Sequence, residues 1–218
     1  MKAKLALLPL AVLLAGASVV AFHPGVAYAA PRLAAAPRTP MIAAATYAID
    51  PMHTSVSFEI EHMGLSKVHG RIDKFSGRVV EDPDLAKASV EFTGEIASID
   101  TAVPARDKHI QAPDYFDAEK YPTLSFKSTK VAKAGEDYVV TGDLTIKGVS
   151  KSVAITFSHR GPVEAPGTGP ARVGVIAQPF TIKRTDFGIG KGDKMPNGVM
   201  PLSDEVVMRL SLEATKEG

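Results

Sequence analysis

The sequence predicts an all-β protein whose strands form one antiparallel system, either two stacked sheets or a barrel. Apolar residues recur at every second position in segment after segment, which places them on one face of a strand. The segments are joined mostly by short turns, and none has a helical period long enough for a βαβ crossover. About eight or nine sequential antiparallel strands stack as two sheets or close into a barrel.

The first 29 residues have the features of an export signal. Lys2 and Lys4 form a basic end, residues 5–22 are almost entirely apolar, and residues 27–29 (Ala-Tyr-Ala) fit the small-x-small pattern of a signal peptidase site. We expect cleavage after Ala29 and a periplasmic or secreted protein. The alternative is an uncleaved membrane anchor, because an apolar run of this length also spans a bilayer.

Composition excludes several classes of protein. The chain has no cysteine, so it is neither a lipid-anchored lipoprotein nor a disulfide-stapled fold. Loss of the signal removes two lysines and no acid, which changes the formal charge from +1 to −1. A near-neutral chain lacks the basic excess of a nucleic-acid binder, so we expect no nucleic-acid partner. Residues 30–45, rich in Ala and Pro, are typical of a flexible linker, and residues 46–216 then form one domain.

The domain begins with a strand near Thr46, a turn at Asp50-Pro51 and two strands folded about residues 63–66. In the first of these two strands the apolar residues alternate with serines and glutamates, the pattern of a half-buried strand. Gly70 and Gly77, within residues 67–80, indicate a bulge or a close approach of two backbones. Later strands are expected at residues 67–80, 88–96, 123–131, 138–146, 153–157, 173–185 and 205–213, with a Pro/Gly-rich loop at 161–170.

A short helical excursion near residues 104–121 interrupts the strands. Pro104 suits the first turn of a helix, and residues 105–111 are enough for two turns. Residues 114–121 predict a second short helix that Pro122 ends. Three aromatic residues are concentrated in this second segment, so we expect a lid or plug over one end of the strands.

Seven short motifs occur in order between residues 47 and 213. They are residues 47–54 (YAIDPMHT), the pair Phe58 and His62, Gly70 with 75–77, 106–110 with 115–117, 121–122 with 126–128, 142–151 and 184–189. Together they resemble the YceI family, and the resemblance covers nearly the whole domain. Thr54 and Ser150 replace the more usual Ser and Thr, and Val175 stands where the family usually has Phe, a change that reshapes the expected pore.

The resemblance implies an extended, lipocalin-like antiparallel barrel that is exported to the periplasm or beyond. It also implies an apolar pore that binds a long-chain amphiphile, a polyisoprenoid or a fatty lipid, with no cofactor and no catalysis. An exposed final strand allows a homodimer, and contact with a membrane would be transient once the signal is removed.

The inward strand faces supply the candidate pore lining. Small residues such as Ala88, Gly94, Gly142 and Ala177 stand among large ones, which argues against a completely filled interior. A dry pocket of roughly 300 Å³ costs about 7 kcal/mol, and an apolar tail offsets this loss at about 0.8 kcal/mol per methylene. An ordinary packed core remains the alternative. The candidate lining residues are Val56, Phe58, Ile60, Val90, Phe92, Leu124, Phe126, Val140, Leu144, Ile155 and Phe180.

Five cationic or titratable residues within the motifs are candidates for binding a polar head group: His53, His62, Arg106, His109 and Arg184. At a barrel mouth such side chains hydrogen-bond a phosphate, a quinone oxygen or a carboxylate. The alternative is a structural role in ion pairs and caps. The histidines lack the close spacing of a metal site, and no nucleophile stands in a recognisable catalytic set.

Three functions therefore compete. The first is an exported carrier of an isoprenoid or similar lipid. The second is an enzyme that acts on a quinone-like isoprenoid with His53, His62 and His109 as acid and base groups. The third is a stress-response interaction module without a ligand, which a fully packed interior would favour.

Overall fold

The computed structural model describes residues 44–164, 167, 169–190 and 194–218. The predicted signal peptide, and all but the last two residues of the predicted linker, lie outside these residues. Among the described residues, no helix is long and apolar enough to cross a membrane. Because residues 1–29 lie outside the described part of the chain, export and signal cleavage stay predictions.

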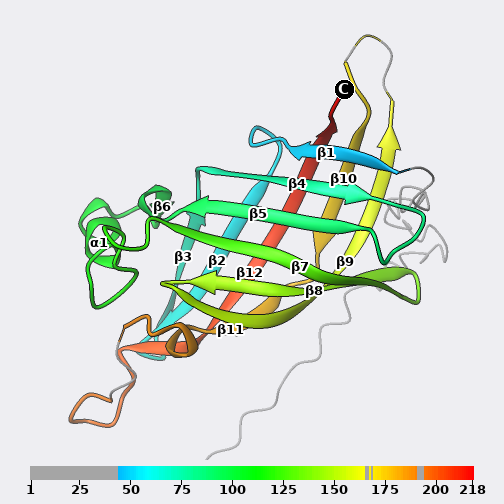
Figure 1. Ribbon diagram of the computed structural model, residues 1–218. Coiled ribbons are helices and arrows are strands. Elements are labelled where there is room, and N and C mark those ends of the chain that lie inside the picture. The colour runs from blue at the N-terminus through cyan, green and yellow to red at the C-terminus, as the bar shows by residue number, and fades with distance from the viewer. Residues whose placement is uncertain (1–43, 165–166, 168, 191–193) are drawn as a thin grey trace, which may run out of the picture. The chain divides into compact units, whose positions relative to one another are not determined.

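The described chain forms one antiparallel sheet of twelve strands (Figure 1). The strands are β1 (Ala45–Ile49), β2 (Ser55–His62), β3 (Ser66–Ile72), β4 (Phe75–Glu81), β5 (Ser89–Glu95), β6 (Ile99–Asp100), β7 (Thr123–Ala134), β8 (Asp137–Ile146), β9 (Val149–Val163), β10 (Arg172–Ala177), β11 (Phe180–Lys183) and β12 (Leu202–Lys216). The helical elements are η1 (Ile96–Ser98), α1 (Pro104–Ile110) and η2 (Arg184–Phe187).

The sheet closes into a barrel through β12, which crosses the picture in red (Figure 1). The order β1-β4-β5-β7-β8-β9-β10-β12 returns to β1, because β12 pairs with both β10 and β1 in its second half. The first half of β12 pairs with β11 and β2, and β3 and β6 extend the wall from β2. These eight closed strands confirm the predicted all-β barrel.

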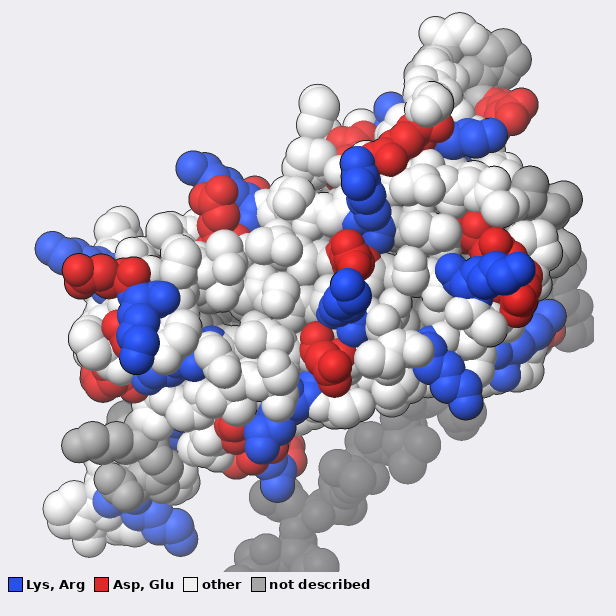
Figure 2. All heavy atoms as spheres, viewed as in Figure 1, with Lys and Arg blue, Asp and Glu red and all other residues white. Residues whose placement is uncertain are grey.

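The barrel wall is built by the alternation seen in the sequence. Inward residues of successive strands form one large apolar core and a smaller cluster of Tyr47, Val79, Val173 and Ala214, whereas the outward positions are mostly polar. On the outer face seen in Figure 2, positive and negative side chains are interspersed rather than gathered by sign. That face carries no basic patch of the kind that nucleic-acid binding requires.

Several predicted boundaries were wrong. The expected strand 67–80 is two strands, β3 and β4, and the expected strand 173–185 is β10, β11 and the turn η2. The strand expected at 173–185 breaks at Gln178-Pro179, because proline has no N–H to donate to a neighbouring strand. The helix at 105–111 is confirmed as α1, but residues 114–121 form successive turns rather than a helix. Asp117 there has a φ of 51°, which a right-handed helix does not accommodate.

The ring of Phe58 on β2 lies directly over Gly70 on β3. Gly70 pairs with Phe58 across β2 and β3, and a Cβ added at Gly70 would lie 2.3 Å from the Cζ of Phe58. We expect Gly70→Ala to destabilise the fold by about 1–3 kcal/mol through overpacking, as measured by urea unfolding. Gly174→Ala on β10 is the control, since a Cβ there has 3.6 Å to its nearest neighbour. Equal losses in both variants would contradict the prediction.

Candidate functional site

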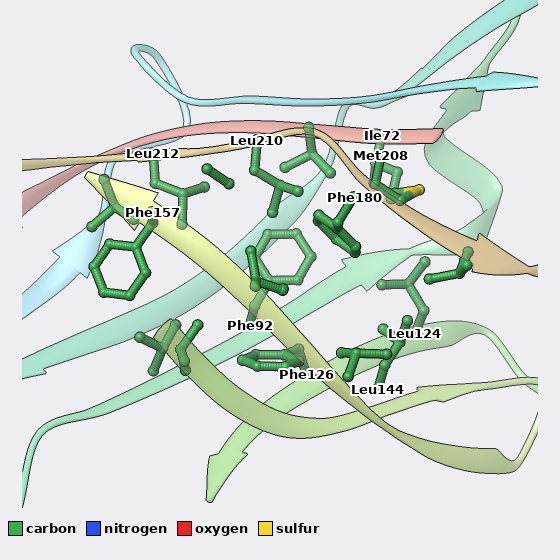
Figure 3. A pocket seen from close by; sticks show the side chains of 18 of the residues that line it. Ile72, Phe92, Leu124, Phe126, Leu144, Phe157, Phe180, Met208, Leu210 and Leu212 are labelled. Carbon is green, nitrogen blue, oxygen red and sulfur yellow. The ribbon is translucent and has the colours of Figure 1, made fainter. Parts of the chain in front are cut away.

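Two cavities occupy the barrel interior. The narrow cavity has a volume of about 100 Å³, and its lining residues are all apolar (Figure 3). The wide cavity has a volume of about 330 Å³ and lies at the end of the barrel that carries α1. Its lining includes the exposed residues His62 and Ser66, so it reaches the protein surface.

The predicted pore residues all line one of these cavities. Phe58 and Ile60 line the wide cavity and the other nine line the narrow one, with Leu124 lining both. In Figure 3, Phe92, Phe126 and Phe180 come from different strands and point into the same space. The geometry that the alternation predicted is thus present, and contact of these residues with a ligand stays a prediction.

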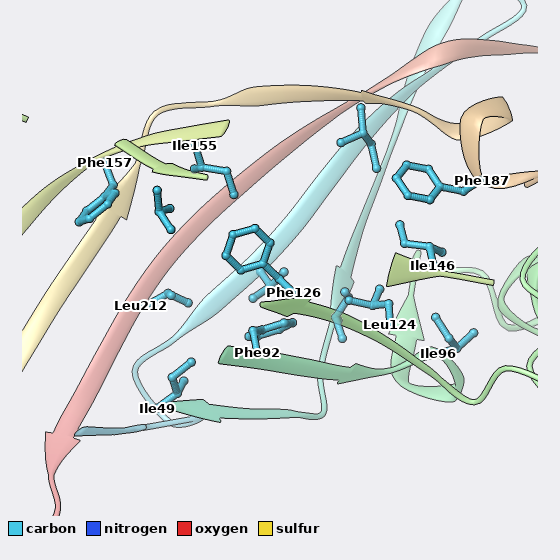
Figure 4. Packing of buried hydrophobic residues seen from close by; sticks show 14 of the residues in the cluster. Ile49, Phe92, Ile96, Leu124, Phe126, Ile146, Ile155, Phe157, Phe187 and Leu212 are labelled. Carbon is cyan, nitrogen blue, oxygen red and sulfur yellow. The ribbon is translucent and has the colours of Figure 1, made fainter. Parts of the chain in front are cut away.

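A single layer of side chains separates the two cavities. Five residues line both of them, and we call this layer the waist: Ile72, Leu124, Ile146, Ile182 and Met208. Figure 4 shows Leu124 and Ile146 between the central Phe126 and the buried Phe187. Met208 has an unbranched, flexible side chain that adapts to a changing space. An apolar tail that displaces the waist side chains would run through both cavities.

Arg184 brings a buried guanidinium group to the wide cavity. The side chain is 3% exposed and belongs to η2. Nε, Nη1 and Nη2 donate hydrogen bonds to the carbonyl oxygens of Ser203 (2.9 Å), Ile189 (2.8 Å) and Leu202 (3.2 Å). These bonds fix the plane of the guanidinium, and they tie η2 to the start of β12.

Arg106 brings a second guanidinium group to the same cavity, from α1. Its Nε and Nη2 donate to the hydroxyl (2.7 Å) and the carbonyl (2.8 Å) of Thr101. Thr101 is itself buried, and both its N–H and its hydroxyl donate to Oδ1 of Asp107. The orientation of Arg106 therefore depends on a buried threonine that an aspartate holds in place.

The five predicted polar residues do not form one site. His62, Arg106 and Arg184 line the wide cavity, whereas His53 and His109 line neither cavity. His109 packs edge-on against Tyr115, with 5.0 Å between ring centroids, and its Nε2 lies 3.8 Å from a carboxylate oxygen of Asp114. Three of the five candidates therefore lie at the wide cavity and two do not, and head-group binding by any of them stays a prediction.

His53 belongs to a polar clasp on the barrel wall. Its Nδ1 lies 2.9 Å from Oδ2 of Asp50, and Nη1 of Arg172 bonds to both Asp50 (2.9 Å) and Glu213 (2.6 Å). The hydrogen bond from His53 is the largest cause of the lowered pKa of Asp50. Ligand atoms of Asp50, His53 and Glu213 lie within 4.8 Å of one another. Because Arg172 already bonds to both carboxylates, we interpret the cluster as a tie between the end of β1, β10 and β12.

A buried polar cluster that the sequence analysis missed lies near the narrow cavity. Glu81 and His159, 2% and 4% exposed, bond to each other across β4 and β9. Tyr138 packs edge-on to His159, and its ring stacks on Phe157, which lines the narrow cavity. The alternation contained a signal, because Glu81 continues the inward series of Val79, and His159 continues that of Ile155 and Phe157.

Tyr47 completes this cluster. Burial, together with the charge of Glu81 and a hydrogen bond to it, raises the pKa of Tyr47 from 10.0 to about 12. A folded-state pKa above the unfolded value means that the protonated phenol stabilises the fold fully below pH 10, and that this contribution is lost as pH rises through 12. We expect unfolding monitored by circular dichroism to show falling stability in this window. Tyr47→Phe should reduce the slope, and an unchanged slope in that variant would contradict the assignment.

Several known proteins resemble this chain in sequence or in fold. A family model described as a YceI-like domain matches residues 47–214. A UPF0312 protein of Photorhabdus laumondii is 40% identical over 177 residues, which are 80% of this chain and 88% of that protein. The crystal structure of BcnA from Burkholderia cenocepacia superposes with a TM-score of 0.66 at 30% identity, covering 77% of this chain and 99% of that one. A polyisoprenoid binding domain from Saccharophagus degradans has a TM-score of 0.59 at 16% identity, covering 78% and 98%.

Proposed function

Because the chain belongs to the YceI-like domain family, we propose that it is an exported carrier protein that holds a polyisoprenoid or a similar long-chain lipid inside its barrel. Export is supported by the signal-like sequence of residues 1–29. The Saccharophagus domain, which shares the fold, is described as binding a polyisoprenoid. The same ligand class suits the barrel interior of this chain.

The observation that carries the proposal is the pair of adjacent cavities that share the five waist residues. The narrow cavity offers only apolar side chains, and the wide cavity adds two guanidinium groups and an imidazole at the α1 end. A molecule with a long apolar tail and one polar end matches this distribution. Each methylene that the tail buries contributes about 0.8 kcal/mol, so a few isoprene units bind firmly with few polar contacts.

The cavities also bear on the other two candidate functions. An enzyme with His53, His62 and His109 as acid and base groups would need them around one pocket, but of these three His62 lines the wide cavity and the other two line neither of the two cavities described above. A ligand-free interaction module would need a filled interior, whereas the wide cavity alone has a volume of about 330 Å³. Neither alternative has an observation in its favour.

Native mass spectrometry of the protein from the periplasmic or secreted fraction tests the proposal. We expect an adduct of defined stoichiometry that denaturation releases as a polyisoprenoid or a fatty chain. The mass of the protein should be that of residues 30–218. A bare protein that also takes up nothing from a lipid extract would refute the carrier function, and the full-length mass would refute the cleavage.

A further inference from the structure

The charged residues in the described lining of the wide cavity are both arginines. Arg106 and Arg184 line it, and none of the described residues in its lining is an aspartate or a glutamate. The other described lining residues are apolar except for His62, Ser66, Thr101 and the hydroxyl-bearing Tyr115. The cavity is therefore an apolar space with two permanent positive charges at its wall.

Two acids beside these arginines, Asp107 and Asp204, are already bonded to threonines. Oδ1 of Asp107 accepts from the N–H and hydroxyl of Thr101, at 2.9 and 2.5 Å. Oδ1 of Asp204 accepts in the same way from Thr185, at 3.1 and 2.6 Å. Neither aspartate lines the cavity. Each acid thus bonds to a threonine beside an arginine, and the arginine lines the cavity whereas the acid does not.

Arg106 has donor capacity left over. Its Nε and Nη2 are used by Thr101, and Nη1 makes no hydrogen bond to any residue in the described part of the chain. A guanidinium presents its donors in a planar fork that suits carboxylate and phosphate oxygens. A half-buried cation in an apolar cavity also gains more from an anion than an exposed cation does, because water screens it less.

On this basis, and resting on the carrier function proposed above, we infer that the wide cavity is a subsite for an anionic head group, so that the natural ligand is a long-chain phosphate or carboxylate rather than a neutral lipid. The tail of such a ligand extends through the waist into the narrow cavity. Arg106 is the residue that contacts the head group directly, and Arg184 contributes a fixed positive charge from the opposite element.

The test compares two probes with the same tail, farnesyl monophosphate and farnesol, by isothermal titration calorimetry on delipidated protein. We expect the phosphate to bind about 10- to 100-fold more tightly than the alcohol, the range for a charge-assisted hydrogen bond. Arg106→Gln should remove most of this difference, because it should weaken binding of the phosphate far more than binding of farnesol. Palmitate against palmityl alcohol repeats the comparison for a carboxylate, and separates a general anion site from a phosphate site.

Lys108→Gln is the matched control, because Lys108 lies on the same helix, is exposed and does not line the cavity. It should keep the full preference for the anionic probes. Arg106→Lys keeps the charge but loses the planar fork, so we expect an intermediate preference. Circular dichroism of all three variants shows whether each is folded, and Arg106→Lys carries the test if Arg106→Gln is not.

Equal affinity of the wild-type protein for both members of each probe pair would overturn the anionic subsite and leave the carrier function standing. An equal loss of phosphate and alcohol affinity in Arg106→Gln would also overturn it, since Arg106 would then act on cavity shape alone. Failure of every probe to bind would refute the carrier function, and this inference with it.

Discussion

Replacing Glu81 by alanine is expected to lower the free energy of unfolding by about 3–5 kcal/mol, the loss associated with removing one partner of a buried, hydrogen-bonded pair. Glu81 bonds to His159 inside the barrel, and both side chains are almost completely buried. Tyr47 also hydrogen-bonds to Glu81. The alanine variant leaves these partners without their carboxylate, and it leaves a space where the side chain was. Urea unfolding measures the loss.

The matched control is Glu91→Ala. Glu91 lies on the neighbouring strand β5, and its ion pair with Lys127 (3.0 Å) is exposed, with 58% of the Glu91 side chain accessible. An exposed pair contributes about 0–1 kcal/mol, so this variant should unfold almost like the wild type. The double variant Glu81→Leu/His159→Leu should recover much of the stability, because apolar residues of similar volume often replace a buried pair at little cost.

Losses of the same size in Glu81→Ala and Glu91→Ala would show that the buried Glu81–His159 pair contributes no more to the free energy of unfolding than the exposed pair does. A double variant less stable than Glu81→Ala would show that the polar cluster specifies the packing near the narrow cavity rather than merely tolerating it.

Replacing Met208 by tryptophan is expected to weaken the binding of a long polyprenol by about 100-fold. Met208 lines both cavities, so a larger and stiffer side chain there closes the waist. A tail confined to the wide cavity loses the burial of about four methylenes, each contributing about 0.8 kcal/mol. A short prenol that the wide cavity holds by itself should lose little affinity. Calorimetry with the two ligands measures the contrast.

Met208→Leu is the control, since it keeps nearly the same volume and should leave both affinities within a few-fold. Thermal unfolding of each variant excludes a collapsed barrel. Equal effects of Met208→Trp on long and short tails would show that the ligand does not pass the waist, and would confine the tail to the wide cavity.

Strand positions and the apolar lining could be read from the sequence because both depend on local alternation. Val56, Phe92 and Phe126 face inward for the same reason that their sequence neighbours face out. Some predicted boundaries were wrong because a pattern of strand or helix residues was taken to continue past a residue that ends it. Pro179 breaks the strand expected at 173–185, and the aromatic segment at 114–121 forms turns.

The polar residues could not be sorted in this way. His53 and His109 stand in motifs as distinct as that of Arg106, yet they lie outside both cavities. Glu81 and His159 are 78 positions apart, and only the pairing of strands around the closed barrel brings them into contact. No feature of either segment by itself names the other as its partner.

The sequence by itself thus determined the all-β class, the inward face of each strand and the family, since periodicity and motifs are properties of short segments. The tertiary structure decided which charges share a cavity, where the waist lies and how much space remains. Those properties depend on barrel closure and on the small difference between the volume that the backbone encloses and the volume that the side chains fill.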